Sequence, residues 1–204
     1  MSIVFSGRVR VLAAIISLAA FIGLGVQSTL NLERDGSPLV SFALLLRFFT
    51  IWSNLAAAVL FAWIAAKGSI HRAVPFALAT ALTIVAIVYH ALLAADHHPV
   101  GLDWYTNQMH HTVIPAATVG WWLAFTRPVD NGWKDLPLVM IAPVAYTVFA
   151  LVYGEMSGFY AYFFLDVLQY GYGRVFANIA GLALVFMMFG ALLLALRRLV
   201  SARA

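Results

Sequence analysis

Six runs of mostly apolar residues, each close to the roughly 20 residues that cross a bilayer as a helix, dominate this sequence. Helices are the expected form, because lipid cannot satisfy open backbone groups and the alternation typical of a β-barrel is missing. The sequence predicts an all-α polytopic integral membrane protein, one bundle of six transmembrane helices over residues 1–204. The runs are Val11–Leu30, Leu39–Ala66, Ala73–Ala94, Tyr105–Phe125, Leu136–Tyr153 and Val175–Leu196.

The composition agrees with a membrane protein. Hydrophobic residues make up 64% of the chain and charged residues 10%, against about 25% charged residues in an ordinary soluble domain. The chain has no cysteine, so disulfides and thiolate metal sites are excluded. The first run is longer than the apolar part of a signal peptide and no A-x-A pattern follows it, so we expect an uncleaved span.

Basic residues concentrate on the side of the predicted bundle that holds both termini. The opposite side has only Arg34 and Arg174, with Arg47 inside the second run. Because the basic side of short loops stays in the cytoplasm, we expect both termini to be cytoplasmic and the protein to lie in the inner (plasma) membrane of the cell. The residues on the basic side are Arg8, Arg10, Lys67, Arg72, Arg127, Lys134, Arg197, Arg198 and Arg203.

The longest loop, from about Gly154 to Arg174, falls on the outer side and reads "GEMSGFYAYFFLDVLQYGYGR". It is too rich in glycine and tyrosine to be a seventh span. An aromatic segment with a few polar groups suits the membrane interface, either as an anchor or as a re-entrant piece.

Polar residues within the second run carry information, because an arginine at a helix centre costs about 2.5–3.5 kcal/mol on the insertion scale. Arg47, Thr50 and Asn54 are spaced three and four apart, which predicts one shared helical face in the outer half of the span. Each also has an ordinary explanation. The arginine can snorkel to headgroups, the threonine can bond its own backbone, and the asparagine can join two helices.

The third and fourth runs bring histidines to the same leaflet. His90 lies about one turn inside the outer boundary, and Asn107 and His111 are four apart on one face. Pro115 cannot donate to the His111 carbonyl, so we expect the helix to be weakened there. His110 points about 100° away from His111.

Two chemistries can use this set. Thr50 and His111 would supply a nucleophile and a general base for acyl transfer, with Arg47 or Asn54 stabilising an oxyanion or holding a carboxylate. Alternatively, His90 and His111 would ligate a haem. A two-haem path across the bilayer is excluded, since no histidine lies in the inner half of any run.

Three stretches, "FFTIWSNL", "NQMHHTVIP" and "GFYAYFFLDVLQYGYGRV", resemble the bacterial six-span branch of the androgen-induced and androgen-dependent family of integral membrane proteins. Animal members of that family are threonine hydrolases that cleave fatty acid esters of hydroxy fatty acids. The resemblance implies Thr50 as nucleophile and His111 as base, with His110 as the neighbouring alternative. Its third stretch has Ala161 and Phe163 where relatives tend to have proline.

The leading hypothesis is a membrane-embedded hydrolase of lipid (fatty acid) esters that reach it from the outer leaflet. Asn107 would orient the site, His90 would support it, and the loop up to Asp166 would cover it. We expect a lipid ester as partner, and no cofactor, metal or nucleic acid. The alternative is a lipid-binding or transport protein without catalysis that uses the same pocket.

Overall fold

The computed structural model describes residues 2–201, so Arg203 lies outside the described part. The chain folds into helices of very different lengths joined by short turns, with one small pair of strands. The α-helices are α1 (Gly7–Leu30), α2 (Leu32–Asp35), α3 (Pro38–Leu45), α4 (Phe49–Lys67), α5 (Ala73–Val88), α6 (Leu102–Gln108), α7 (Ile114–Phe125), α8 (Ile141–Ser157) and α9 (Val167–Ser201). The remaining elements are β1 (Ser2–Val4), β2 (Ser69–His71), the π-helical turns η1 (Tyr89–Leu93) and η2 (Met109–Val113), and the 3₁₀ turns η3 (Pro128–Asp130), η4 (Trp133–Met140) and η5 (Phe163–Leu165).

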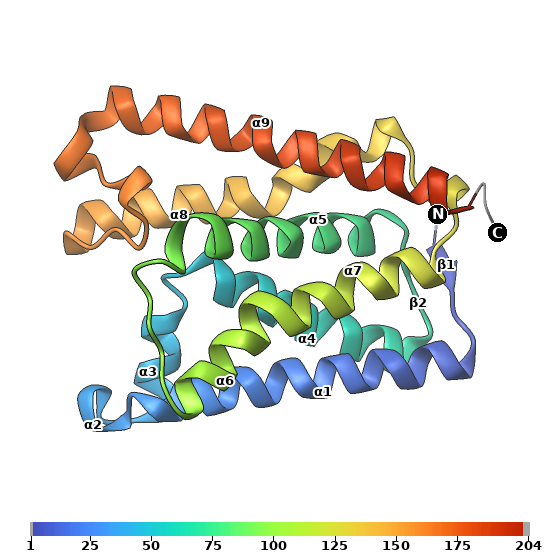
Figure 1. The fold of residues 1–204 in the computed structure, drawn as a ribbon, viewed down its shortest axis with the longest axis horizontal. Helices are drawn as coiled ribbons and strands as arrows, with labels where there is room; N and C mark the ends of the chain where they lie inside the picture. Colours follow the sequence, from blue (N-terminus) through green and yellow to red (C-terminus); the bar gives the residue numbers. More distant parts are fainter. Residues whose placement is uncertain (1, 202–204) are drawn as a thin grey trace.

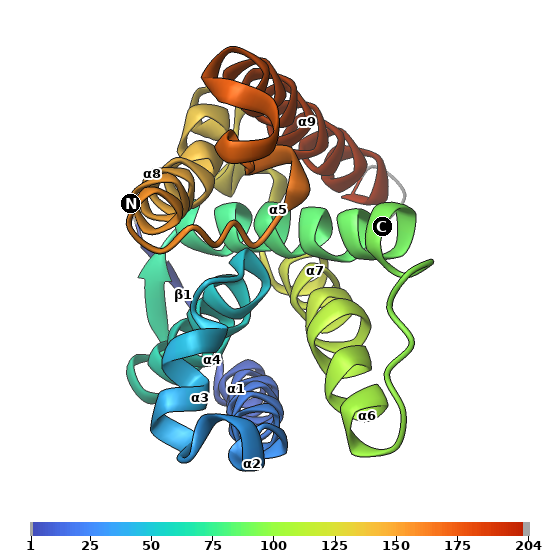
Figure 2. The ribbon, with the colours of Figure 1, turned by 90° about the vertical axis from the view of Figure 1, so that its left-hand side faces the viewer.

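The long helices run from one end of the molecule to the other (Figure 1). The antiparallel pair β1–β2 marks one end, here called the sheet end. Helices α2 and α3 and the connection between α8 and α9 mark the other, here called the loop end. Viewed from the loop end, α5 lies between two groups, with α8 and α9 on one side and α1, α4, α6 and α7 on the other (Figure 2).

Five helices in the described residues are long and apolar enough to cross a membrane. They correspond to five of the six predicted spans: Gly7–Leu30, Phe49–Lys67, Ala73–Leu93, Trp133–Ser157 and Val167–Val200. The predicted fourth span, Tyr105–Phe125, is not among them, although residues 102–125 are helical throughout. Its half near the loop end carries amide, hydroxyl and imidazole side chains, which lower its hydropathy.

The predicted second span, Leu39–Ala66, is not one helix. The chain turns at residues 46–48, between α3 and α4, so the face predicted for Arg47, Thr50 and Asn54 does not extend to Arg47. Aromatic side chains bond the open backbone groups of this turn, which an apolar environment would otherwise leave unsatisfied. The Tyr146 hydroxyl donates to the Arg47 carbonyl at 2.7 Å, the Trp52 indole donates to the Leu46 carbonyl at 2.7 Å, and the Phe49 amide donates to the Tyr162 hydroxyl at 3.1 Å.

The connection between α8 and α9 is shorter than the predicted loop of Gly154–Arg174. Helix α8 continues to Ser157, and α9 already begins at Val167. The first turn of α9 is set off by a kink at Gly171, whose φ of 69° is a conformation that other residues rarely adopt. The segment between the two helices, residues 158–166, is called the aromatic loop below.

Small residues let α1 and α4 pack closely, as is common between membrane helices. Ala13 and Ala20 of α1 and Ala57 and Ala58 of α4 are fully buried in one cluster. The Ser17 hydroxyl donates to the Ala58 carbonyl at 2.7 Å across the same interface. This close pair holds α4 in place, and the start of α4 carries the site described next.

Basic residues gather at the sheet end, where α1 begins and α9 ends. Several of them hold neighbouring elements together. Arg10 donates to the Ala65 carbonyl at 2.9 Å, Arg72 donates to Asp135 at 2.9 Å, Arg127 pairs with Asp130 at 3.6 Å, and the Arg198 guanidinium lies 5.2 Å from the Trp133 ring centre.

Candidate functional site

Thr50 occupies the second position of α4, directly after the turn at residues 46–48. Its Oγ1 lies 3.4 Å from Nε2 of His111, which is 61 residues away in the chain. The turn places this hydroxyl at the N-terminus of a helix, where the first backbone N–H groups are open and the helix dipole favours negative charge. The structure thus brings together the two residues that the sequence analysis paired.

A second hydrogen bond determines the orientation and tautomer of His111. Its Nδ1 lies 3.1 Å from the carbonyl oxygen of Asn107. A carbonyl can only accept, so Nδ1 carries the proton and donates it. The lone pair of Nε2 therefore faces the Thr50 hydroxyl, which is the arrangement a general base needs.

The π-helical turn η2 (Met109–Val113) contains His111 and produces this geometry. Its backbone bonds skip one residue more than in an α-helix, and the Ile114 amide donates to the Met109 carbonyl. Pro115, which lacks an N–H, follows one residue later. The expected weakening of the helix at this proline therefore takes the form of a π-turn, a feature often found at functional sites.

The Tyr89 ring packs against one face of the His111 ring. The two rings stack with centroids 3.8 Å apart and an angle of 19° between their planes. Asn107 Nδ2 donates to the Tyr89 hydroxyl at 2.6 Å, and this hydroxyl in turn lies 3.2 Å from His97 Nδ1. Tyr89 is buried at the start of the π-turn η1, so two π-turns face each other at this site.

The hydroxyl of Tyr162 reaches Thr50 from the aromatic loop. It accepts from the Phe49 amide at 3.1 Å and also lies against the hydroxyl and amide of Thr50. Burial raises the pKa of Tyr162, against the opposing effect of its bonds to Thr50 and Phe49. The phenol stays protonated as a result. It can donate to a negatively charged oxygen that forms beside Thr50.

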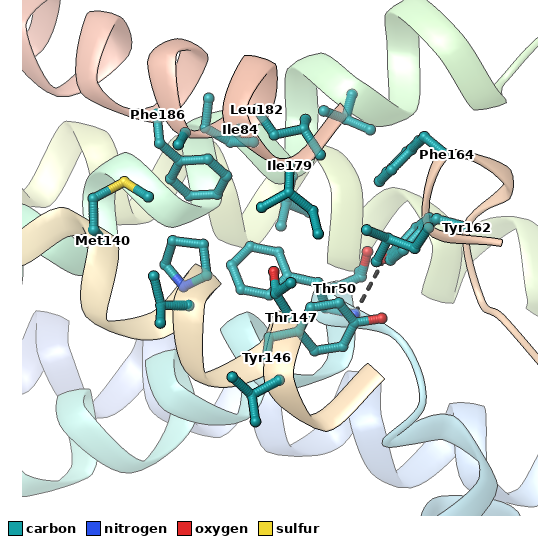
Figure 3. Close-up of a pocket in the computed structure, with 18 of the residues that line it drawn as sticks. Thr50, Ile84, Met140, Tyr146, Thr147, Tyr162, Phe164, Ile179, Leu182 and Phe186 are labelled. Atoms are coloured by element: carbon teal, nitrogen blue, oxygen red, sulfur yellow. Dashed lines mark hydrogen bonds between the residues drawn. The ribbon is translucent and has the colours of Figure 1, made fainter. Parts of the chain in front are cut away.

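An apolar cavity of about 210 Å³ begins at Thr50 and extends among α5, α8 and α9 (Figure 3). Tyr146, Tyr162 and Phe164 surround its end near Thr50, whereas Met140 and Phe186 lie at the opposite end. Thr147 is one of the few polar side chains that line it. An apolar lining with a few polar groups near one end suits a ligand that is mostly apolar and has a polar end.

A second apolar cavity, of about 450 Å³, lies between α4, α5 and the segment from η4 to α8. Phe49 lines both cavities and separates them. The second cavity includes Ser53 and extends to His71 at the sheet end, but Thr50 does not line it. Of these two cavities, the first is therefore the one that reaches Thr50.

Asn54 and Asn107 both support the pair. Asn54 Nδ2 donates to the Thr50 carbonyl at 2.9 Å and to the His110 carbonyl at 3.1 Å, so it ties α4 to η2. Asn107 contributes its carbonyl to His111 and its side-chain amide to Tyr89. The two asparagines hold together the elements that carry Thr50 and His111.

Three predicted site residues lie apart from Thr50. The His110 ring is buried and faces Gly23 of α1, so it is His111 that meets the hydroxyl. His90 is exposed and bonds Thr112 at 3.1 Å. Asp166 accepts from the Gln169 amide at 3.0 Å and caps the start of α9.

Arg47 turns towards the aromatic loop. Its Nε donates to the Leu44 carbonyl at 2.7 Å, and its guanidinium lies 4.2 Å from the centre of the Phe159 ring. A cation over an aromatic face is a favourable arrangement. Arg47 thus joins the turn before α4 to the aromatic loop at the loop end, close to the aromatic cover of Thr50.

Tyr89 and Tyr162 were not among the predicted site residues. Tyr162 lies within the third resembling stretch, which was its only sequence signal. Tyr89 has the weaker signal of standing next to His90 in an otherwise apolar run. Their roles depend on contacts with α4 and η2, which no local pattern encodes.

No group of three or more histidine, aspartate or glutamate side chains suited to a metal ion occurs among residues 2–201. Comparisons with protein-family models, with characterised proteins and with solved structures gave no match to this chain. The geometry of the site therefore carries the functional argument.

Proposed function

We propose that the chain crosses the inner membrane six times, with both termini in the cytoplasm and Thr50 in the outer half of the bilayer. Five apolar helices and the helical segment 102–125 support this topology. Polar side chains of that segment are buried and bond neighbouring elements, because Thr106 donates to Gln27 of α1 and Asn107 donates to Tyr89 of η1. The basic residues at the sheet end favour the cytoplasm for that end.

We further propose that the protein hydrolyses lipid esters with Thr50 as nucleophile and His111 as general base. One observation carries this proposal: Oγ1 of Thr50, which lines an apolar cavity, lies 3.4 Å from Nε2 of His111. Catalytic hydrogen bonds are often long before substrate binds. The same two residues are those implied by the resemblance to the androgen-induced and androgen-dependent membrane protein family.

The reaction follows from this geometry. Thr50 Oγ1 attacks the ester carbonyl carbon while its proton moves to His111 Nε2. The Thr50 amide and the Tyr162 hydroxyl stabilise the resulting oxyanion. Its collapse breaks the ester C–O bond, and the alcohol leaves with the proton from His111. Water then attacks the acyl-threonine with His111 again as base, which releases the fatty acid and restores Thr50.

Turnover of fluorogenic fatty acid esters by the purified protein tests this function. We expect Thr50→Ala and His111→Ala each to lower kcat/KM by at least about 1,000-fold, because the residues of a nucleophile–base pair act as a unit. A fluorophosphonate probe should label the native protein and not Thr50→Ala.

Thr29→Ala and His98→Ala are matched controls. Thr29 is exposed and bonds only its own helix, at the Val26 carbonyl, and His98 is exposed in the connection between η1 and α6. Both controls should keep native turnover. Hydrolysis that survived in Thr50→Ala and His111→Ala would refute the assignment.

A second function, lipid binding or transport without catalysis, is favoured by the larger cavity, which does not reach Thr50. It predicts bound lipid that stays intact and no covalent labelling of Thr50. The same experiments separate the two functions.

A further inference from the structure

The cavity below Thr50 has a definite far end. Met140 and Phe186 lie opposite Thr50 (Figure 3). Met140 also packs against the buried cluster that contains Phe76, Val139 and Leu193, so dense protein continues behind it. A hydrocarbon chain that runs along the cavity from Thr50 to this end therefore meets the Met140 side chain.

The length of the cavity follows from the helices that line it. Thr147 and Met140 both line the cavity and are seven residues apart, which corresponds to about 10 Å of helix rise. An extended hydrocarbon with bonds of about 1.5 Å advances roughly 1.25 Å per bond. The cavity thus accommodates about eight to ten carbons.

We propose that this cavity binds the acyl side of the ester and that Met140 sets the longest acyl chain the enzyme accepts, at about ten carbons. This inference rests on the proposed function, because it places the carbonyl carbon of the ester at Thr50 Oγ1. The length of the acyl chain is counted from that carbon. The alcohol part of the ester then points away from the cavity, towards the aromatic loop and Arg47. Esters of medium-chain fatty acids are the substrate class.

Esters of one fluorescent alcohol with saturated acyl chains of four to sixteen carbons test the proposal. Each buried methylene is worth about a fourfold gain, so kcat/KM should rise by about that factor per carbon up to about C10 and fall beyond it. Met140→Ala removes three side-chain atoms beyond Cβ. The acyl-chain length with the highest kcat/KM should increase by about three carbons in this variant, and kcat/KM for the C12 ester should rise about tenfold.

Two further variants make the test specific. Met140→Trp fills the end of the cavity opposite Thr50, so the highest kcat/KM should occur with a shorter acyl chain. Leu138→Ala is the matched control, because Leu138 lies two residues away and lines the second cavity instead. Its chain-length profile should equal that of the native protein.

A binding measurement separates this inference from the proposed function. Thermal stabilisation of the Thr50→Ala protein by free fatty acids of six to sixteen carbons reports the cavity without turnover. If the native protein turns over esters but its profile is the same in Met140→Ala and Met140→Trp, the length limit is wrong and the hydrolase stands. If no ester is turned over but the preferred fatty acid changes with Met140, the hydrolase is wrong and the length limit stands. If neither turnover nor a change in preference is found, both are wrong.

Discussion

Two neighbouring residues, Asn107 and Tyr89, fix the position of His111 beside Thr50. The imidazole is held at Nδ1 by a backbone carbonyl and on one face by the Tyr89 ring. These contacts fix both its tautomer and its orientation before a substrate arrives. Preorganisation of this kind accounts for a large share of enzymatic rate enhancement.

Substitutions of Tyr89 separate its ring from its hydroxyl. Tyr89→Phe keeps the stacking and should lower kcat less than tenfold. Tyr89→Ala removes the stacking and should lower kcat about 100-fold with little change in KM, because a misplaced base affects the chemical step more than binding. Steady-state kinetics with the C8 ester measures both.

Tyr105→Ala is the control for this pair of variants, since Tyr105 is 64% exposed on α6. It should keep native kcat. Equal losses of kcat in Tyr89→Phe and Tyr89→Ala would contradict a positioning role for the stacked ring.

Among the elements, the aromatic loop depends on the close approach of Tyr160 to α8. A Cβ added at Gly154 would overlap the Tyr160 ring, whereas one added at Gly173 of α9 meets nothing within 4 Å. The Tyr160 and Tyr172 hydroxyls both donate to Glu155, at 3.2 Å and 2.7 Å. These contacts hold the loop that brings Tyr162 to Thr50.

Gly154→Ala should therefore displace the aromatic loop. We expect a loss of about 1–3 kcal/mol in stability, a lower Tm and faster proteolysis within residues 158–166, together with reduced turnover. Gly173→Ala should keep or raise Tm, because alanine favours a helix by about 1 kcal/mol over glycine. Indistinguishable Tm and proteolysis in the two variants would disprove the close contact.

The helices were easier to predict from the sequence than the turn before α4 or the contacts of the site. Hydrophobic runs predicted five of the described helices, because length and apolarity suffice for a membrane helix. Three of them agree to within four residues at each end, whereas the second begins at Phe49 instead of Leu39 and the last at Val167 instead of Val175. The turn at residues 46–48 was not predicted, since the run Leu39–Ala66 contains neither glycine nor proline. Two of the side chains that bond the backbone in and next to that turn, Tyr146 at Arg47 and Tyr162 at Phe49, lie far along the chain. Residue type and helical spacing paired Thr50 with His111, but contacts across the bundle were needed to find Tyr89.

For the whole molecule, the absence of cysteine makes the proposed topology directly testable. Single cysteines can be placed in the native chain without removing others. His98→Cys at the loop end should react with a membrane-impermeant maleimide in intact cells. Val129→Cys, at a position 78% exposed in η3 at the sheet end, should react only after permeabilisation. The reverse pattern would invert the proposed orientation.

The turn before α4 also has a consequence for biosynthesis. Tyr146 follows Arg47 by 99 positions, and Tyr162 follows Phe49 by 113. At about 5–20 residues per second, the ribosome makes these tyrosines roughly 5–20 s after the segment they stabilise. Until then the Trp52 indole can bond the Leu46 carbonyl, but the bonds from Tyr146 and Tyr162 cannot form. The set of contacts that places Thr50 at the start of α4 is therefore complete only when the last third of the chain has been inserted. A chain truncated or stalled before Tyr146 therefore carries Thr50 without the contacts that place it at the start of α4.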